Sequence, residues 1–191
     1  LSGIGWMQAR GEARTPGEIK TCSIMRKSDG WFLSLVVSCE PHREISSNAH
    51  EIGAVDWGIE TYATLTRGLN DFDLIPNDRF WSNEAAGLKD DQRELSKALR
   101  GKRSRSAEKK RRLLAKRHRK LANQRKNRSH QVSSRLIRDH KVLVTENLTP
   151  KNMSRSARGT AQKPGKNVAQ KAGLNRAILD TAPGDLISML T

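Results

Sequence analysis

One segment of the sequence carries almost all of its net charge. Residues 97–141 hold 19 lysines and arginines but only two acids, Glu108 and Asp139, so their formal net charge is +17. The rest of the chain holds 17 basic and 18 acidic residues and is nearly neutral. A like-charged segment this dense repels itself and resists folding unless a polyanion neutralises it, which indicates nucleic-acid binding. The alternative is a solvent-exposed charged face that has no ligand.

Apolar residues recur at helical spacing in and just before this basic segment. Gly101 and the serines at 104 and 106 divide them into two groups. The groups are Leu88, Leu95 and Leu99, then Leu114, Leu121, Val132 and Leu136. This spacing predicts a helical hairpin over about residues 84–140, with a narrow packing stripe and a wide basic face.

The cations of the predicted basic face are the candidate nucleic-acid-binding residues. They are Lys109, Lys110, Arg111, Arg112, Lys116, Arg117, Arg119, Lys120, Arg125, Lys126 and Arg128. No Phe, Trp or Tyr lies among them. We therefore expect them to hold the sugar–phosphate backbone of a nucleic acid rather than to read its bases.

The first part of the chain has the pattern of a β-hairpin. Two β-prone runs make up residues 18–38, and an Asp-Gly pair at 29 and 30 provides a strong turn signal between them. We predict that Trp6, Trp31 and Phe32 pack a small β core. Base-stacking aromatic residues are the alternative.

Two further strands each end in an acid. Short strands are predicted at about residues 51–56, 61–66 and 72–75, and a fourth at about 141–146. Asp56 ends the first of these strands and Glu146 ends the fourth. The first run has no polar alternation, which is typical of a central strand covered on both faces.

Asp56 and Glu146 are therefore candidate metal ligands. If their strands are parallel neighbours, both acids meet at one edge of the sheet. Carboxylate oxygens are the protein ligands that Mg²⁺ takes, and metal ions held beside a phosphodiester can activate water for its hydrolysis. The alternative is that both acids simply end strands near solvent.

The last part of the chain is predicted to hold a loop and a helix. Residues 151–166 are basic, contain Gly and Pro, and show no apolar periodicity, which predicts a flexible loop. Leu174 and Ile178 begin a final helix that is interrupted at Pro183. We expect Asp180 and Asp185 to cap helices or face solvent rather than to take part in catalysis.

Several protein classes are excluded by the same sequence. No apolar run approaches the roughly 18 residues that span a bilayer, and the first residues have no apolar core of a secretory signal. The chain begins at Leu1, so we expect that its true start is missing. Cys22 and Cys39 are too few for a zinc site and are interpreted as buried reduced thiols. The five histidines show no metal-binding spacing.

Four stretches, in order, resemble the TnpB (OrfB) family of insertion-sequence transposases, relatives of type V CRISPR effectors. GAVDWGIETYATLT at 53–66 resembles the first RuvC motif of the family, and VLVTENL at 142–148 the second. The hairpin up to Glu40 resembles the end of the wedge-like β domain of the family. KRHRKLANQR at 116–125 resembles its helical insertion, and GLNRAILD at 173–180 the helix after the second motif.

This resemblance implies a fold and a division into domains. The fold is α/β, with an RNase H-like (RuvC-like) mixed sheet and a long basic helical-hairpin insertion, preceded by a small β-hairpin or β-barrel fragment. Residues 1–48 would be the C-terminal part of the wedge-like domain. Residues 49–191 would be an incomplete RuvC-like nuclease domain, with the insertion at about 84–140.

The resemblance also implies an activity. Family members are RNA-guided DNA endonucleases, so Asp56 and Glu146 would be catalytic residues that bind Mg²⁺. The implied partners are DNA and a guide RNA, with no membrane and no small-molecule substrate. The implied location is the cytoplasm of a bacterium or archaeon, associated with the nucleoid.

Departures from the family leave a second function open. Family members continue into a CxxC…CxxC zinc ribbon and a third catalytic Asp, whereas this sequence ends at Thr191 with neither, and zinc is expected only if that ribbon exists. An N-terminal recognition region is also missing, and Asn147 stands where many members have Asp. The alternative function is a truncated, catalytically inactive RNA- or DNA-binding relic or repressor with the same fold.

Overall fold

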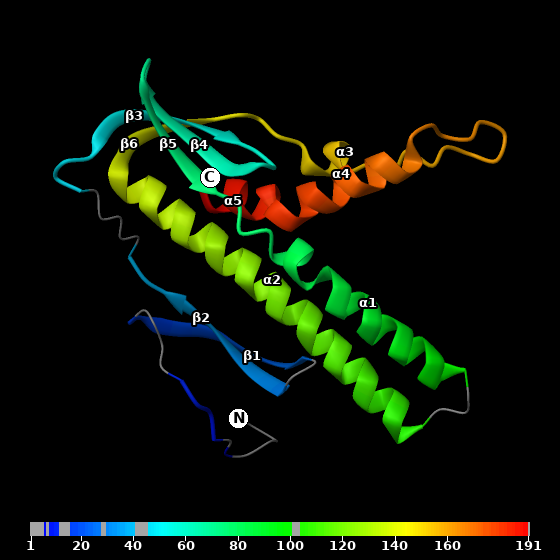
Figure 1. The fold of residues 1–191 in the computed structure, drawn as a ribbon. Coiled ribbons are helices and arrows are strands. Elements are labelled where there is room, and N and C mark those ends of the chain that lie inside the picture. The colour runs from blue at the N-terminus through cyan, green and yellow to red at the C-terminus, as the bar shows by residue number, and fades with distance from the viewer. Residues whose placement is uncertain are drawn as a thin grey trace. The chain divides into compact units, whose positions relative to one another are not determined.

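The computed structural model describes residues 6, 8–11, 16–27, 30–40, 46–100 and 104–190. The chain divides into two compact units, Leu1–Arg43 and Glu44–Thr191. Figure 1 shows a two-stranded sheet in the first unit, and a four-stranded sheet with helices in the second. The mixed α/β character expected from the sequence is confirmed.

The first unit contains the predicted hairpin. Strands β1 (Glu18–Lys27) and β2 (Gly30–Ser38) pair in an antiparallel ladder. The prediction of a buried aromatic core is wrong, because Trp31 is 70% exposed and Trp6 fully exposed, although Phe32 is half-buried. In the described residues of this unit, two strands form a single layer, and one layer cannot bury a side chain between layers.

The two cysteines also differ from the prediction. Cys22 lies on β1 and Cys39 follows β2, and both are exposed free thiols rather than buried ones. The cause is the same single layer, which leaves the thiol of Cys22 without a covering element in the described part of this unit.

The second unit is built on a mixed sheet. Its strands are β3 (His50–Trp57), β4 (Thr61–Gly68), β5 (Asp71–Pro76) and β6 (His140–Thr145), in the order β5-β4-β3-β6. The first three form an antiparallel meander, and β6 runs parallel to β3. All four strands were predicted to within two residues at each end.

Two long helices connect β5 to β6. They are α1 (Phe80–Leu99) and α2 (Arg105–Asp139), the predicted helical hairpin. Ser104 caps α2, because its Oγ accepts a hydrogen bond from the N–H of Ala107 at 3.1 Å. A capping side chain satisfies one of the unpaired N–H groups in the first turn of a helix. Ser104, predicted to break the helical pattern, therefore marks the start of the second helix.

Three shorter helices complete the second unit. They are α3 (Pro150–Met153), α4 (Val168–Thr181) and α5 (Pro183–Leu190). Ala182 adopts a left-handed conformation between α4 and α5, so the break predicted at Pro183 is confirmed. No helix in the described part of the chain has both the length and the apolar character that a membrane crossing requires.

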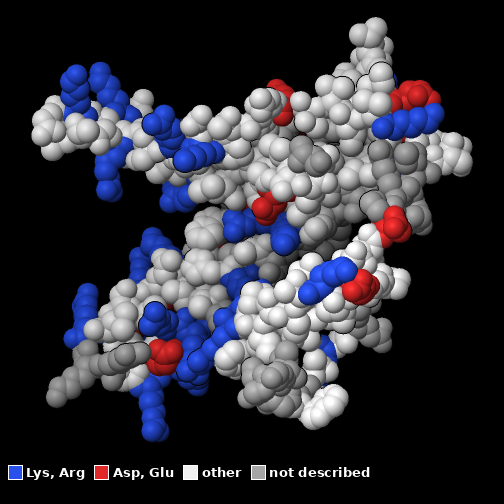
Figure 2. Space-filling model, turned by 180° about the vertical axis from the view of Figure 1, so that it is seen from behind, with Lys and Arg blue, Asp and Glu red and all other residues white. Residues whose placement is uncertain are grey.

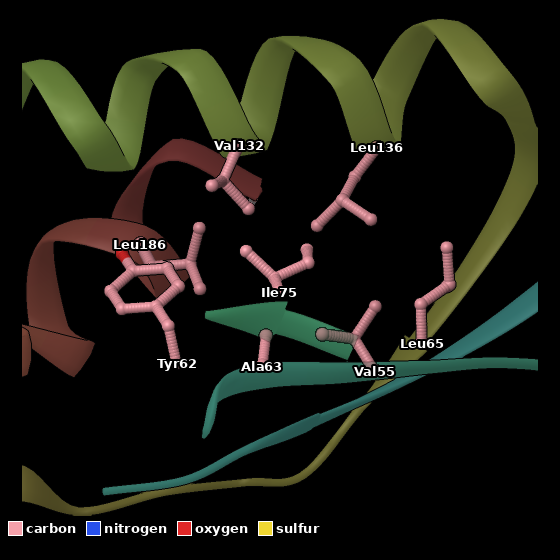
Figure 3. Packing of buried hydrophobic residues seen from close by; sticks show 8 residues of the cluster. All are labelled: Val55, Tyr62, Ala63, Leu65, Ile75, Val132, Leu136 and Leu186. Carbon is pink, nitrogen blue, oxygen red and sulfur yellow. The ribbon is translucent and has the colours of Figure 1, made fainter. Parts of the chain in front are cut away.

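One face of the sheet is packed against helices. Figure 3 shows Val132 and Leu136 of α2 above side chains of the sheet, with Leu186 of α5 beside them. The buried side chains of the sheet are Val55, Tyr62, Ala63, Leu65 and Ile75. Of the predicted stripe, Leu88 and Leu121 are also buried, whereas Leu99, in the last turn of α1, is 56% exposed.

The other face of the sheet is open, which contradicts the prediction that the first strand is covered on both faces. Ile52 of β3 is 59% exposed, and Val142 and Val144 of β6 are 53% and 54% exposed. Strand β3 is central in hydrogen bonding, because it pairs with β4 and β6, but within the described residues of the second unit helices cover only one of its faces. A strand that pairs with neighbours on both edges need not be buried on both faces. The apolar run of β3 predicted its central place in the sheet but not its burial.

Candidate active site and basic surfaces

The register of β3 and β6 places Asp56 and Glu146 side by side. Val55 pairs with Thr145 in the parallel ladder. Asp56 follows Val55 within β3, and Glu146 directly follows Thr145, the last residue of β6. Neighbouring strands lie about 4.8 Å apart, and residues at the same register position point to the same face. Val55 is buried on the helix side, so Asp56 lies on the open face, and both acids are exposed.

The backbone around Asp56 is held by close approaches at two glycines. A Cβ on Gly53 would lie 2.5 Å from Cδ2 of the His140 ring, which is itself fully buried. A Cβ on Gly58 would lie 2.6 Å from the carbonyl oxygen of Thr61, inside the turn that joins β3 to β4. Both contacts require glycine, so the GAVDWG stretch is shaped to pack β3 tightly against β6 and β4.

His140 anchors the start of β6 beneath the sheet. Its Nδ1 lies 3.0 Å from the carbonyl oxygen of Leu136, and its ring stacks on His50 at 5.5 Å between centroids. His50 and His140 are also registered partners in the ladder. The end of α2 and the first residue of β3 are therefore joined through one buried side chain, which sets the register that brings the two acids together.

The donor set at this edge suits a hard divalent cation. Two exposed carboxylates could supply one oxygen ligand or more each, and Mg²⁺ commonly binds through one or two carboxylates while keeping several waters. Among the described residues, no group of three or more His, Cys, Asp or Glu side chains lies close enough to hold a metal. Asp56 and Glu146 therefore belong to no larger cluster of this kind in the described residues.

The structure divides the candidate nucleic-acid-binding residues of α2 into two sets. The first set makes contacts within the protein: Lys110 with Glu94, Arg112 with Glu108, Arg117 with Asp91, Arg125 with the carbonyl of Leu179, and Arg128 with Asp78 and the carbonyl of Pro76. Arg119 is half-buried. The exposed remainder is Lys109, Arg111, Lys116, Lys120 and Lys126.

Three of these exposed lysines form a row on the outer side of α2. Lys109, Lys116 and Lys120 are seven and four residues apart, which places them on one face of a helix. Leu121 and Leu136 occupy the opposite, buried side. The wide basic face predicted from the sequence is therefore present, although it contains fewer available cations than the sequence suggests.

One carboxylate between the two long helices has a strongly shifted pKa. The ammonium groups of Lys110 and Lys97 lie 2.9 and 3.0 Å from the two oxygens of Glu94. Their hydrogen bonds lower the pKa of Glu94 to about 2. Glu94 therefore stays ionised and links α1 to α2, which neutralises part of the charge of Lys110.

Asp180 caps a helix, as expected, but the helix is α1, which the sequence does not reveal. Its side chain is 6% exposed and accepts a hydrogen bond from the N–H of Trp81, at 2.8 Å to Oδ1. Asp185 is exposed in the first turn of α5. The sequence did not reveal that Arg125 and Arg128 of α2 also bind carbonyl oxygens near this contact, those of Leu179 and Pro76. The residues involved lie far apart in the chain, so no local pattern connects them.

The chain is similar to known transposon proteins over most of its length. Residues 34–157 match the family OrfB_IS605, described as "Probable transposase". A relative from Escherichia coli (strain K12), "Putative RNA-guided DNA endonuclease InsQ", is 33% identical over 180 residues, which are 94% of this chain and 43% of the relative.

A second relative comes from Streptomyces pristinaespiralis. It is named "Putative RNA-guided DNA endonuclease" and is 29% identical over 188 residues, which are 98% of this chain and 40% of the relative. The chain thus spans less than half the length of these curated relatives. Because the family match covers more than half of the chain, including the two stretches that hold Asp56 and Glu146, the chain belongs to the OrfB (TnpB) family of transposases.

Proposed function

We propose that this chain binds DNA together with a guide RNA and takes part in Mg²⁺-dependent cleavage of DNA phosphodiesters at Asp56 and Glu146. The observation that supports the proposal is the parallel pairing of β3 with β6, whose last registered pair, Val55 and Thr145, directly precedes the two acids. The names of the two relatives support the substrate class. In a cell this activity belongs beside the chromosome, in the nucleoid of a bacterium or archaeon.

The strand order supports an RNase H-like arrangement. An antiparallel meander of three strands is followed by helices and a fourth strand parallel to the first. Asp56 is the last residue but one of β3, and Glu146 directly follows β6. This is the layout that the resemblance to RuvC-like nucleases implies. The long helical hairpin between β5 and β6 then corresponds to the insertion of the family.

Asp56 and Glu146 would hold the Mg²⁺. Bound there, the ion would supply Lewis-acid chemistry, polarising the phosphodiester and lowering the pKa of a coordinated water. The two carboxylates fix where that ion lies, and the tight packing of Gly53 on His140 keeps β3 and β6 in the register on which their spacing depends. The open face of the sheet leaves both acids accessible to a nucleic-acid strand.

The exposed cations of α2 would hold the nucleic acid while the acids act on it. Lys109, Lys116 and Lys120 lie in one row and contact phosphates without reading bases. Binding and cleavage are then separate electrostatic tasks. The first needs many dispersed positive charges, whereas the second needs two negative charges at one point.

The test separates these tasks. In a chain of the relatives' full length, Asp56→Ala or Glu146→Ala should abolish Mg²⁺-dependent cutting of a guide-matched duplex and weaken Mg²⁺ binding in calorimetry. Filter binding of the same nucleic acids in EDTA should be unchanged. Asp185→Ala, which removes an exposed acid from α5, is the matched control and should cut normally.

Two results would count against this function. Normal cutting by the Asp56→Ala variant would remove the active-site assignment. Binding by the unmodified full-length protein without any cutting would instead favour the alternative, an inactive nucleic-acid-binding protein or repressor with the same fold.

A further inference from the structure

A second basic surface follows Glu146 in the chain. We define the arm as residues 151–176, which include most of α3, the connection after it and most of α4. Seven lysines and arginines and no acid lie between Glu146 and Asp180. They are Lys151, Arg155, Arg158, Lys163, Lys166, Lys171 and Arg176. The candidate nucleic-acid-binding residues of α2 include none of them.

The tip of the arm, which the sequence predicts to be a flexible loop, contains a hydrogen-bonded turn. Gly159 and Pro164 form an antiparallel bridge, and the N–H of Thr160 donates to the carbonyl of Lys163 at 3.0 Å. The N–H of Gly165 donates to the carbonyl of Arg158 at 2.9 Å. These bonds hold Arg158 and Lys163 at fixed places on the backbone.

The root of the arm is also tied together. Nζ of Lys171 donates to the carbonyl of Met153 at 2.6 Å, and Nδ2 of Asn175 donates to the carbonyl of Ser154 at 2.9 Å. Helix α3 is thereby fastened to α4. A surface ordered in this way loses less conformational entropy when it binds a ligand than a free loop does.

The cations of the arm are not neutralised within the protein. Lys151, Arg155, Arg158, Lys163, Lys166 and Arg176 are exposed, and none of them forms an ion pair in the described part of the chain. On α2, by contrast, ion pairs with acids of α1 compensate Lys110 and Arg117. Uncompensated like charges repel one another, and a bound polyanion relieves that repulsion.

Figure 2 shows where this surface lies. Blue side chains gather on the arm at upper left and on the α1–α2 hairpin at lower left, and the molecular surface is hollowed between them. Helices α1 and α4 are in contact, and Asp180 near the end of α4 bonds to Trp81 near the start of α1. Basic side chains therefore lie on both sides of the hollow.

We propose that the arm is a second phosphate-binding surface, which holds the DNA strand whose phosphodiester reaches Asp56 and Glu146. The arm begins five residues after Glu146, so its first residue is separated from that acid by at most about 17 Å of chain. No aromatic residue occurs after Trp81 in the chain, whereas protein interfaces are enriched in aromatic anchors, so charge is the means of recognition here. The inference rests on the proposed function for the identity of the strand.

The experiment neutralises charge on each surface separately. The arm variant is Arg155→Gln, Arg158→Gln, Lys163→Gln and Lys166→Gln. The helix variant is Lys109→Gln, Lys116→Gln, Lys120→Gln and Lys126→Gln. The matched control keeps every charge of the arm: Arg155→Lys, Arg158→Lys, Lys163→Arg and Lys166→Arg. Each is titrated at several salt concentrations with fluorescein-labelled single-stranded DNA, and with RNA of the same sequence.

We take the slope as a positive number, the steepness with which log affinity falls with log salt. The arm variant should lower this slope by about 3 on DNA, since each lost phosphate contact removes about 0.7. The charge-retaining control should bind like the unmodified protein. If the helix variant lowers the slope and the arm variant does not, the inference is wrong and the proposed function stands. If neither lowers it, the proposed nucleic-acid binding itself is wrong.

Two further outcomes are decisive. A loss of RNA binding with unchanged DNA binding would overturn the assignment of the strand to DNA. If circular dichroism shows that the arm variant is unfolded, the double variant Lys163→Gln and Lys166→Gln, confined to the structured tip, replaces it. Its slope should fall by about 1.4, and an unchanged slope would overturn the inference.

Discussion

Asp180 caps helix α1 from a position 99 residues further along the chain. Its two carboxylate oxygens accept hydrogen bonds from the N–H of Trp81 at 2.8 and 3.0 Å. The residue at the usual capping position of α1, Arg79, has a left-handed backbone and no capping side-chain bond. Asp180, near the end of α4, thus supplies the capping acceptor that Arg79 does not provide. The same bond joins α1 of the helical hairpin to α4.

Removing this cap should destabilise the second unit. We expect Asp180→Ala to lower the free energy of unfolding by about 1–2 kcal/mol, because the loss of a capping carboxylate leaves a buried N–H unpaired. Asp180→Asn keeps an acceptor but loses the charge at the helix N-terminus, so its effect should be smaller, about 0.5 kcal/mol. Urea denaturation measures both. Asp185→Ala is the control, and an equal loss there would contradict the capping role.

Gly53 should not tolerate a side chain. Gly53→Ala places a methyl group 2.5 Å from Cδ2 of His140, and relieving that overlap should cost about 1–3 kcal/mol of stability. Gly68→Ala is the matched control, because a Cβ there meets nothing within 4 Å. Thermal unfolding of the two variants checks the prediction, and similar melting temperatures would show that β3 and β6 adjust freely.

The buried hydroxyl of Tyr62 should make stability fall at high pH. It lies 3.0 Å from Oγ of Ser129, and burial raises the pKa of Tyr62 above its ordinary value of 10.0. Because the pKa is raised in the folded state, the neutral hydroxyl of Tyr62 contributes fully to the free energy of unfolding below pH 10.0. This contribution is lost as pH rises toward the pKa of the folded state.

The variant Tyr62→Phe isolates that contribution. It should lose about 1 kcal/mol at neutral pH through the missing hydrogen bond, and its stability should then depend less on pH above 10 than that of the unmodified protein. Denaturation at a series of pH values measures the difference. Parallel pH profiles for the two proteins would refute the assignment to Tyr62.

The ion pairs of Glu94 should be visible in its titration. We expect NMR to give a pKa of about 2 for its carboxyl group, rising toward the ordinary value of 4.5 in Lys110→Gln. The Lys97→Gln variant should show a smaller rise, because Lys110 has the larger effect. The carboxylate is half exposed, so added salt should also raise the pKa by screening both lysines. A pKa independent of salt would contradict the ion pairs.

Local patterns in the sequence were enough to predict the six strands, the two long helices and the candidate acid pair, although not α3. The Asp-Gly turn indicated the hairpin, and the spacing of Leu88, Leu121 and Leu136 indicated the two long helices that the structure contains. Asp56 and Glu146 could be identified because an acid that directly ends an apolar run is visible in the sequence. These features can be predicted from the sequence because turn conformation and helical periodicity depend on residues close together in the chain.

Only the tertiary structure decided which apolar residues are buried and which charged side chains form contacts within the protein. Trp31 and Ile52 look like core residues in the sequence and are exposed, while Asp180 looks like a surface residue and is buried under α1. Arg125 and Arg128 belong to the basic run but bind carbonyl groups of other segments. Burial and ion pairing depend on which element packs on which, and no local pattern contains that, because the partners lie far apart in the sequence and meet only when the chain folds.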